Sequence, residues 1–257
     1  NYSGYPMVKE ARERVRAGAV GEIRKVVVEY SQGWLRTLLE AEDHKQASWR
    51  ADPERAGVSS ALGDIGSHAE HLARYVTGLG TEALFADLGT LVDGRVLEDD
   101  ATVLIRYAGG ARGVLIASQI SAGERNHLRL RVYGSEGALD WQQERPDRLR
   151  IARPDGSELI VYDGADGLSE RAVVHTRLPS GHPEGFIEAF ANLYRNVAAT
   201  IDARAGRARP GPFDDDFPTV QDGARGVFFI GRAVESAQAG TWLAAGYDPP
   251  GGIQREG

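Results

Sequence analysis

The chain has 257 residues, of which 42% are hydrophobic and 26% charged, a composition typical of a globular protein that buries a sizeable core. It contains no cysteine, which excludes a disulfide framework and a thiolate metal cluster and fits a cytoplasmic protein. The formal net charge of −7 argues against nucleic acid as a partner, and the longest apolar runs are too short to span a bilayer. This composition favours a small molecule as the partner.

The first predicted elements are a helix and a strand. The helix follows a candidate N-cap at Ser3, has Pro6 in its first turn and stops at Gly18. Residues 23–34 are rich in β-branched and aromatic side chains, which predicts a strand. The polar residues 38–57 that follow lack a clear period and are predicted to be a long surface loop or a disordered segment.

A helix at residues 59–78 precedes a series of predicted strands. The stronger strand patterns fall at residues 84–92, 102–108, 113–120, 128–133 and 138–142, and the weaker ones at residues 149–152 and 159–162. Consecutive strands with helices before and after them predict an α+β fold, in which a mostly antiparallel open sheet has helices packed on one face.

The last third of the chain predicts two amphipathic helices, one from Pro183 and one from about Thr219 to Ala239. Each has an apolar stripe at helical spacing. The stripe of the first comprises Phe186, Phe190, Leu193, Tyr194, Val197 and Ile201, and that of the second Val227, Ile230 and Val234.

The predicted helix SSALGDIGSHAEHLARYVTG, residues 59–78, contains residues that are unusual for a core helix. Asp64, His68, His71 and Tyr75 recur at helical spacing beside the apolar stripe, where they can line a cleft. Asp64 and His68 are four residues apart and so can hydrogen-bond. A carboxylate beside an imidazole raises its basicity, which suits a general base working near neutral pH.

Two glycines in the same stretch, Gly63 and Gly66, each cost a helix roughly 1 kcal/mol relative to alanine. Close approach of another backbone or of a ligand would explain them. A capped first turn with a surface ion pair is an alternative interpretation of the whole stretch. A metal site of Asp64, His68 and His71, with His44, is another, although these residues lack a recognised ligand spacing.

The segment GDIGSHAEHLARYVTG resembles one in the glucose-fructose oxidoreductase and inositol dehydrogenase (Gfo/Idh/MocA) family. In that family the aspartate and the histidine four residues later lie at the active site of NAD(P)-dependent sugar and cyclitol dehydrogenases. Together with further similar segments, the resemblance spans nearly the whole chain. These segments are NYSGYPMVKEARERVRAGAVGEIRKVVVEY, KQASWRADP, GHPEGFIEAFANLY and DGARGVFFIGRAVESAQAGTW.

The resemblance implies that His68 is the catalytic acid/base and that Asp64 orients it or binds a neighbouring hydroxyl. The lysine that completes the family's site belongs to a Glu-Lys-Pro motif that does not occur here, and the glycine-rich turn that holds the pyrophosphate is also missing. Residues 1–257 therefore resemble the substrate-binding and oligomerisation domain alone. An N-terminal nucleotide-binding domain is the expected partner, and NAD or NADP is expected to bind mainly outside this chain.

One segment, GLGTEA at residues 78–83, formally fits the glycine pattern of a dinucleotide-binding turn. That turn requires a strand before it and a helix after it, so that the pyrophosphate meets the helix N-terminus. Here the predicted order is the reverse. We therefore interpret the segment as a helix end and a turn, and we predict no cofactor-binding residue in this chain.

Further candidate substrate-binding residues lie in predicted loops and at the ends of elements. Lys45 and Arg50 can bind hydroxyls and Trp49 can pack on the apolar face of a sugar, although a solvated loop explains them equally well. The remaining candidates are His71, His182, Tyr5 and Trp34, of which the last two are also good candidates for buried packing. The acidic run Asp214 to Asp216 lacks calcium-ligand spacing and is predicted to be a solvated turn.

The expected function is that of the substrate-binding part of an NAD(P)-dependent oxidoreductase acting on a secondary hydroxyl or keto group of a sugar, sugar acid or cyclitol. On this hypothesis the isolated chain is inactive. The alternative is a non-catalytic carbohydrate-binding or assembly module. Because Arg106, Arg129 and Arg131 alternate with apolar residues, the open sheet face is mixed in character, and we expect a homo-oligomer formed through it.

Overall fold

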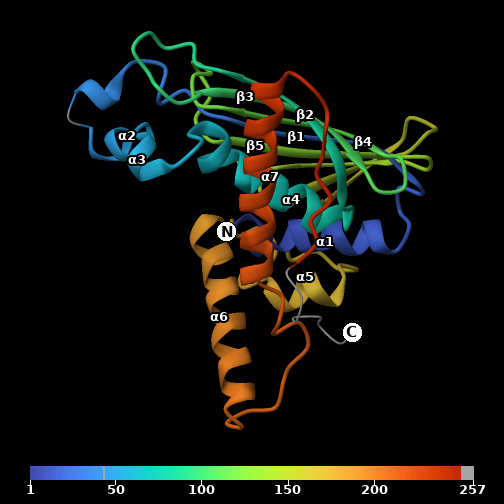
Figure 1. Cartoon of the computed structure of the whole chain (residues 1–257). Coiled ribbons are helices and arrows are strands. Elements are labelled where there is room, and N and C mark those ends of the chain that lie inside the picture. The colour runs from blue at the N-terminus through green and yellow to red at the C-terminus, as the bar shows by residue number, and fades with distance from the viewer. Residues whose placement is uncertain (43, 250–257) are drawn as a thin grey trace. The chain divides into compact units, whose positions relative to one another are not determined.

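The computed structural model describes residues 1–42 and 44–249. They form an α+β fold with a nine-stranded sheet of order β8-β7-β6-β5-β1-β4-β3-β2-β9 (Figure 1). The chain divides into two compact units. Unit 1 comprises Asn1–Glu29, Leu72–Gly78 and Asn126–Pro218, and unit 2 comprises Tyr30–His71, Leu79–Arg125 and Thr219–Gly257.

Unit 1 packs helices against a set of antiparallel strands. Its strands are β5 (His127–Gly134), β6 (Ala138–Gln142), β7 (Arg148–Ala152) and β8 (Glu158–Tyr162), with most of β1 (Ile23–Ser31). Its helices are α1 (Pro6–Arg16), α5 (Glu170–His175) and α6 (Phe186–Arg204). The register aligns Leu130, Trp141, Leu149 and Val161 across four strands, and all four are buried. This row, with α1 packed against β6 and β7, makes the core of the unit.

Unit 2 contains the antiparallel strands β2 (Thr81–Gly89), β3 (Asp100–Tyr107), β4 (Arg112–Ser118) and β9 (Leu243–Ala244). The helices α2 (Lys45–Arg50) and α3 (Pro53–Ala56) precede a π-helical turn, Leu62–Gly66, which leads into α4 (Ser67–Thr77). Residues 67–71 of α4 belong to unit 2 and residues 72–77 to unit 1. The last helix, α7 (Val220–Ala239), packs against β2, and its buried Ser236 accepts a hydrogen bond from the Ala86 amide.

The predicted strands are confirmed to within about three residues at each end. The prediction for residues 38–57 was wrong, because they form a short turn of helix, Leu39–Ala41, followed by α2 and α3. Local capping explains these helices: the His44 and Asp52 side chains accept hydrogen bonds at the two N-termini. The sequence also gave no signal for α5, and Tyr5 rather than Ser3 precedes α1.

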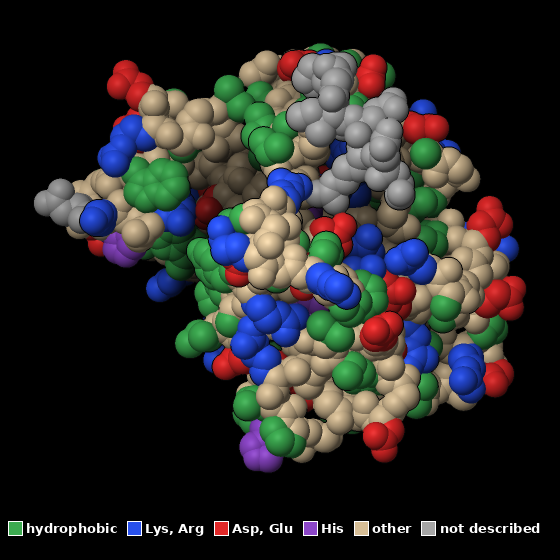
Figure 2. Space-filling view, turned by 90° about the horizontal axis from the view of Figure 1, so that it is seen from below, with side chains coloured by type: hydrophobic (Ala, Val, Ile, Leu, Met, Phe, Trp, Pro, Cys, Tyr) green, Lys and Arg blue, Asp and Glu red, His purple; other side chains and the backbone are tan. Residues whose placement is uncertain are grey.

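Helix α6, which begins at Phe186 rather than Pro183, exposes most of the stripe that its sequence predicts to be buried (Figure 1, orange). Of that stripe, Tyr194 is 70% exposed and Ile201 54% exposed. The opposite face is buried and comprises Ala189, Asn192 and Asn196. Val227 of α7 is likewise 72% exposed. On the face drawn in Figure 2, hydrophobic side chains are interspersed with charged ones. Periodicity therefore identified both helices but not the buried face of α6.

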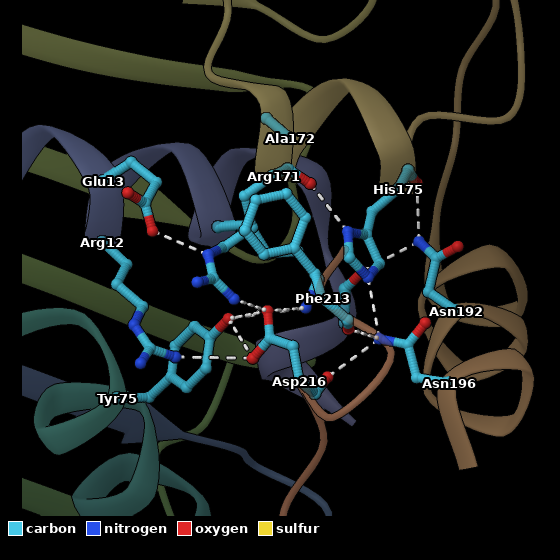
Figure 3. Close-up of polar contacts among 12 residues, drawn as sticks. Arg12, Glu13, Tyr75, Arg171, Ala172, His175, Asn192, Asn196, Phe213 and Asp216 are labelled. Carbon is cyan, nitrogen blue, oxygen red and sulfur yellow. Dashed lines mark hydrogen bonds and ion pairs between the residues drawn. The ribbon is translucent and has the colours of Figure 1, made fainter. Parts of the chain in front are cut away.

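Unit 1 also contains a buried ionic cluster around Asp216 (Figure 3). The carboxylate accepts hydrogen bonds from Lys9 (2.8 Å), Arg171 (2.8 Å), Arg12 (3.4 Å) and the Tyr75 hydroxyl (2.9 Å). The Asp216 side chain is 4% exposed. The prediction of a solvated turn was therefore wrong at Asp216, because four donors replace the water that a buried carboxylate loses.

Candidate active site

A pocket of about 370 Å³ in unit 2 is lined by the start of the predicted functional helix, by the end of β1 and by the segment around α2. Its size falls in the range of small-molecule sites. The lining residues are Tyr30, Gln32, Trp34, His44, Gln46, Arg50, Asp64, Ile65 and His68. Aromatic rings, amides and an Asp/His pair are therefore combined in one concave surface.

The π-helical turn Leu62–Gly66 places Asp64 at the pocket. The buried Glu98 holds the start of this turn, since its carboxylate accepts hydrogen bonds from the Ser59 hydroxyl (2.6 Å) and the Ser60 (2.9 Å) and Leu62 (3.1 Å) amides. Burial raises the pKa of Glu98, although these hydrogen bonds oppose the shift. π-helical turns inside α-helices frequently occur at functional sites.

The two glycines of this turn differ in what they require. A Cβ at Gly66 would lie 2.5 Å from the end of the Leu62 side chain and 3.3 Å from Ala117 of β4, so a larger residue would require the Leu62 side chain to shift. At Gly63 the nearest atom would be 3.4 Å away, which is an ordinary contact. The nearest atoms at both glycines belong to side chains rather than to another backbone, and the approach of a ligand stays a prediction.

Two donors hold the Asp64 carboxylate, and both reach the same oxygen. Arg50 Nε lies 3.0 Å from Asp64 Oδ2, and Gln119 Nε2 lies 2.8 Å from it. The Asp64 side chain remains 27% exposed. The carboxylate is thus fixed from one side and open on the other.

Each of these donors is itself held in place. The Arg50 guanidinium lies 4.4 Å from the Trp49 ring centre and 6.0 Å from that of Trp34, and it also donates to Gln46. Gln119 directly follows β4 and is fully buried, and its backbone bonds to Asp99 and Leu35. Its side-chain oxygen has no hydrogen-bond partner among the residues that the structure describes.

His68 lies in the pocket wall, and its ring centre is 6.4 Å from that of the buried Tyr30. The side chain is open to the pocket, yet desolvation by the surrounding protein lowers the pKa of the imidazole, while the nearby Asp64 charge opposes this shift. The imidazole is therefore neutral near pH 7, which is the form that can accept a proton.

The structure brings together four of the residues predicted to act in catalysis or substrate binding: Asp64, His68, Trp34 and Arg50 all line the pocket. The lining does not include Lys45, Trp49 or His71, although Trp49 supports Arg50. Two other candidates belong to unit 1. Tyr5 is buried there against Trp141, and His182 is exposed in the turn before α6.

Sequence reasoning missed several residues of the pocket, and the signals available for them differ. Tyr30, Gln32 and Trp34 alternate within the strand predicted at residues 23–34, a pattern that would put them on one face, although β1 itself ends at Ser31. His44 was considered only as a metal ligand, but its Nδ1 caps α2 and its ring lies 5.8 Å from that of Trp34. No local pattern marks Gln119, which meets Asp64 across 55 residues of sequence.

Comparison with known proteins decides the family. Residues 8–140, more than half of the chain, match the model of the GFO/IDH/MocA C-terminal domain. The chain belongs to the Gfo/Idh/MocA family. The residues expected from the resemblance, Asp64 and His68, lie within the matched segment.

Several known proteins are similar over 94–95% of this chain. The uncharacterized oxidoreductase YfiI of Bacillus subtilis is 30% identical, and 62% of its length is covered. The levoglucosan dehydrogenase of Pseudarthrobacter phenanthrenivorans is 30% identical, with 65% covered. The crystal structure of an inositol dehydrogenase homolog complexed with NAD+ from Azotobacter vinelandii is 31% identical, with 63% covered and a TM-score of 0.88. The chain thus spans less than two thirds of each of these relatives.

The glycine-containing segment at residues 78–83 does not have the context of a pyrophosphate-binding turn. Residues 78–80 connect α4 to β2, and residues 81–83 open β2, so a strand rather than a helix N-terminus follows the glycines. The structure thus bears out the interpretation of this segment as a helix end and a turn. In the part of the chain that the structure describes, residues 1–42 and 44–249, no helix is long and apolar enough to cross a membrane.

Proposed function

We propose that this chain is the substrate-binding part of an NAD(P)-dependent oxidoreductase that acts on a secondary hydroxyl or keto group of a sugar, sugar acid or cyclitol. The observation that carries the proposal is the pocket in which Asp64 and His68 are combined with Trp34 and Tyr30. Indole and phenol rings pack against the C–H faces of a polyol, and amide groups bind its hydroxyls. The relatives named for levoglucosan and inositol support this substrate class.

In this proposal His68 is the general base. Its lowered pKa keeps the imidazole neutral near pH 7, so it can remove the proton of the hydroxyl that is oxidised. A bound nicotinamide would supply the acceptor for the hydride. The pocket residues hold the hydroxyl-bearing carbon close to His68. Each group accelerates the reaction only when its position relative to the others is fixed.

Asp64 has a positioning role in the same proposal. Arg50 and Gln119 both bind its Oδ2, so Oδ1 is the oxygen available to accept a hydrogen bond from a substrate hydroxyl. Its negative charge also favours the imidazolium that forms when His68 takes up the proton. The cofactor is expected to be held mainly by a nucleotide-binding domain outside this chain, and the open sheet face is the proposed oligomer contact.

The test uses the complete encoded polypeptide that contains this chain. Reduction of NAD and of NADP is followed with myo-inositol, levoglucosan, glucose and gluconate as substrates. His68→Ala is expected to lower kcat/KM by about 10²–10⁴ while cofactor affinity is nearly unchanged. His71→Ala is the matched control, because His71 lies on the same helix but outside the pocket lining, and it should retain activity.

Full activity in His68→Ala would remove the general-base role. Binding of a polyol without any oxidation by the intact polypeptide would favour the alternative of a non-catalytic carbohydrate-binding module. We further expect the isolated chain to be inactive and to bind NAD(H) and NADP(H) weakly or not at all. Tight binding of either cofactor in a calorimetric titration would contradict this expectation.

A further inference from the structure

Helix α6 in unit 1 has an apolar face that the described residues leave uncovered (Figure 1, orange). Six exposed side chains make up this apolar face: Phe186, Ile187, Phe190, Tyr194, Ala198 and Ile201. A helix rises about 1.5 Å per residue, so the apolar face is about 22 Å long. No charged side chain lies on it, whereas a solvated helix face usually carries charged residues. Continuous apolar surface of this kind is typical of a contact with another protein surface.

The aromatic rings of the apolar face support one another along the helix. The ring centre of Phe190 lies 5.0 Å from that of Phe186 and 6.1 Å from that of Tyr194. Side chains that are restrained in this way lose less conformational entropy when a partner covers them. Phe and Tyr are also enriched in the buried centre of protein interfaces. The composition and the ring packing of this face therefore both favour a protein partner.

The opposite face holds α6 in a fixed orientation in unit 1. Asn192 donates hydrogen bonds to the carbonyl oxygens of Gly4 (3.0 Å) and His175 (2.7 Å), and Asn196 Nδ2 lies 2.8 Å from His175 Nε2 (Figure 3). Both asparagines are buried. Turning the helix to bury its apolar face would break these hydrogen bonds and leave polar atoms without partners. The apolar face must therefore be covered from outside the described residues.

The first residues of the chain pack along the same helix. The 3₁₀ turn Tyr2–Gly4 contacts α6, and a Cβ on Gly4 would lie 2.2 Å from the Ala189 carbonyl oxygen, so the two backbones are in direct contact. Asn1 lies just before this turn. Both polar atoms of its side chain are buried without a hydrogen-bond partner among the described residues. Buried polar atoms are normally paired, so a further segment that supplies these partners is expected beside α6.

We propose that the apolar face of α6 is the surface on which the nucleotide-binding domain of the same polypeptide packs. This inference rests on the proposed function, which places such a domain on the N-terminal side of this chain. A domain joined there begins beside α6, because α6 holds the turn Tyr2–Gly4. More than a third of each relative compared above lies outside the part that this chain matches, which is enough for a complete domain.

The charges of the chain favour a protein domain over a membrane surface as the occupant. A helix that lies on an anionic membrane carries lysines or arginines beside its apolar face. Helix α6 has two arginines, Arg195 and Arg204, and Arg195 donates to the Val174 carbonyl oxygen. The net charge of −7 also opposes binding to an anionic surface. A second copy of the chain is the less suitable occupant, because the open sheet face is already the proposed oligomer contact.

The test measures the solvent exposure of the apolar face in the complete encoded polypeptide, without substrate. Hydroxyl-radical labelling followed by mass spectrometry gives the oxidation rate of individual side chains. Ile187 and Tyr194 should be oxidised about tenfold more slowly than free side chains of the same type, because the centre of an interface excludes water. Val173 of α5 is the internal control, since it is an exposed apolar residue outside α6 and should be oxidised at the rate of an exposed side chain.

A substitution tests whether the apolar face holds the domain. Ile187→Asp introduces a charge, and because Ile187 is 77% exposed in this chain, the substitution leaves the core of unit 1 intact. It should release the domain from α6, since burying an unpaired charge is costly. The oxidation of Phe186 and Tyr194 should then rise, and small-angle scattering should show a larger radius of gyration. Val173→Asp is the matched control and should change neither measurement.

Rapid oxidation of Ile187 and Tyr194 in a polypeptide that binds a nicotinamide cofactor would overturn this proposal alone. Protection that increases with protein concentration would assign the apolar face to a second copy, and protection that requires anionic vesicles would assign it to a membrane. Either result would also overturn the proposal. If the complete polypeptide binds no nicotinamide cofactor, the proposed function fails and this inference fails with it, so the two failures are distinguishable.

Discussion

Asp64 and Asp216 are both carboxylates that bind arginine, yet their surroundings differ. Asp216 in unit 1 is 4% exposed, and both of its oxygens accept hydrogen bonds from donors that include Lys9, Arg171 and Tyr75. Asp64 in unit 2 is 27% exposed, and its two donors share one oxygen. A fully paired carboxylate stabilises the fold, whereas a carboxylate fixed on one side keeps an acceptor for a ligand.

The pKa values of the unit 1 cluster agree with a structural role. Burial would raise the pKa of Asp216, but the charges and hydrogen bonds of Lys9 and Arg171 outweigh it and lower the pKa to about 2. Burial also outweighs the attraction of Asp216 for Lys9 and lowers the pKa of Lys9 to about 8, so the lysine stays protonated throughout the acid range. Below neutral pH the ion pair is therefore lost only when Asp216 is protonated.

The largest expected effect comes from removing the charge of Asp216, the fully paired carboxylate. Asp216→Asn leaves the buried Lys9 without its anion and Arg171 with Glu13 alone, so the free energy of unfolding should fall by about 3–5 kcal/mol. Chemical denaturation of the two proteins measures it. Asp215→Asn is the control, because Asp215 is an exposed neighbour and its loss should change stability by about 0.5 kcal/mol or less. Equal effects of the two substitutions would contradict a structural role that is specific to Asp216.

A second prediction concerns stability in acid. Both the Asp216 cluster and the buried His175 contribute to the change in the free energy of unfolding at low pH. Asn196 Nδ2 lies 2.8 Å from His175 Nε2, and burial lowers the pKa of His175 to about 4. A histidine held neutral in the fold contributes stability above its unfolded pKa of about 6.5, and this contribution is lost as the pH falls from there to about 4. Roughly 3 kcal/mol should be lost in this range, and about 2–3 kcal/mol more between pH 4 and 2 as Asp216 is protonated.

Unfolding measured as a function of pH distinguishes the two contributions. His175→Gln should reduce the loss between about pH 6.5 and 4, because glutamine does not titrate. The loss attributed to Asp216 at lower pH should persist in that variant. An unchanged pH profile in His175→Gln would show that the histidine is not kept neutral by burial.

The smallest of these effects is expected at Asp64, the carboxylate that keeps one oxygen for a ligand. Gln119→Leu removes one of the two donors to Asp64 Oδ2 with little change in volume. A hydrogen bond to a charged group contributes about 1.5–3 kcal/mol, so kcat/KM should fall by about 10–100-fold in the intact enzyme. If Gln119 acts by positioning Asp64, the loss should include kcat, and the pH profile of kcat/KM should shift. Gln119→Asn, which keeps the amide on a shorter side chain, should recover part of the activity. If Gln119→Leu lowers the free energy of unfolding but leaves the pH profile of kcat/KM unchanged, Gln119 has only a structural role.

Much of the fold could be predicted from the sequence because its signals are local. The periods of β-branched and apolar residues located the strands from β2 to β8 and the helices α6 and α7. The helical spacing of Asp64 and His68 identified both as candidates before any contact was known, and the structure places both in one pocket. Residue type, period and turn chemistry act within a few residues, so the sequence alone carries this information.

Only the tertiary structure decided which groups those elements meet. The buried face of α6 is polar because Asn192 and Asn196 find partners in unit 1, such as the Gly4 carbonyl and His175, which no period in α6 can indicate. In the same way, Asp64 depends on Gln119 and Asp216 on Lys9, pairs separated by 55 and 207 residues of sequence. The sequence does not distinguish a buried, fully paired carboxylate from one that keeps an oxygen for a ligand. Desolvation and pairing depend on side chains that folding brings from distant parts of the chain.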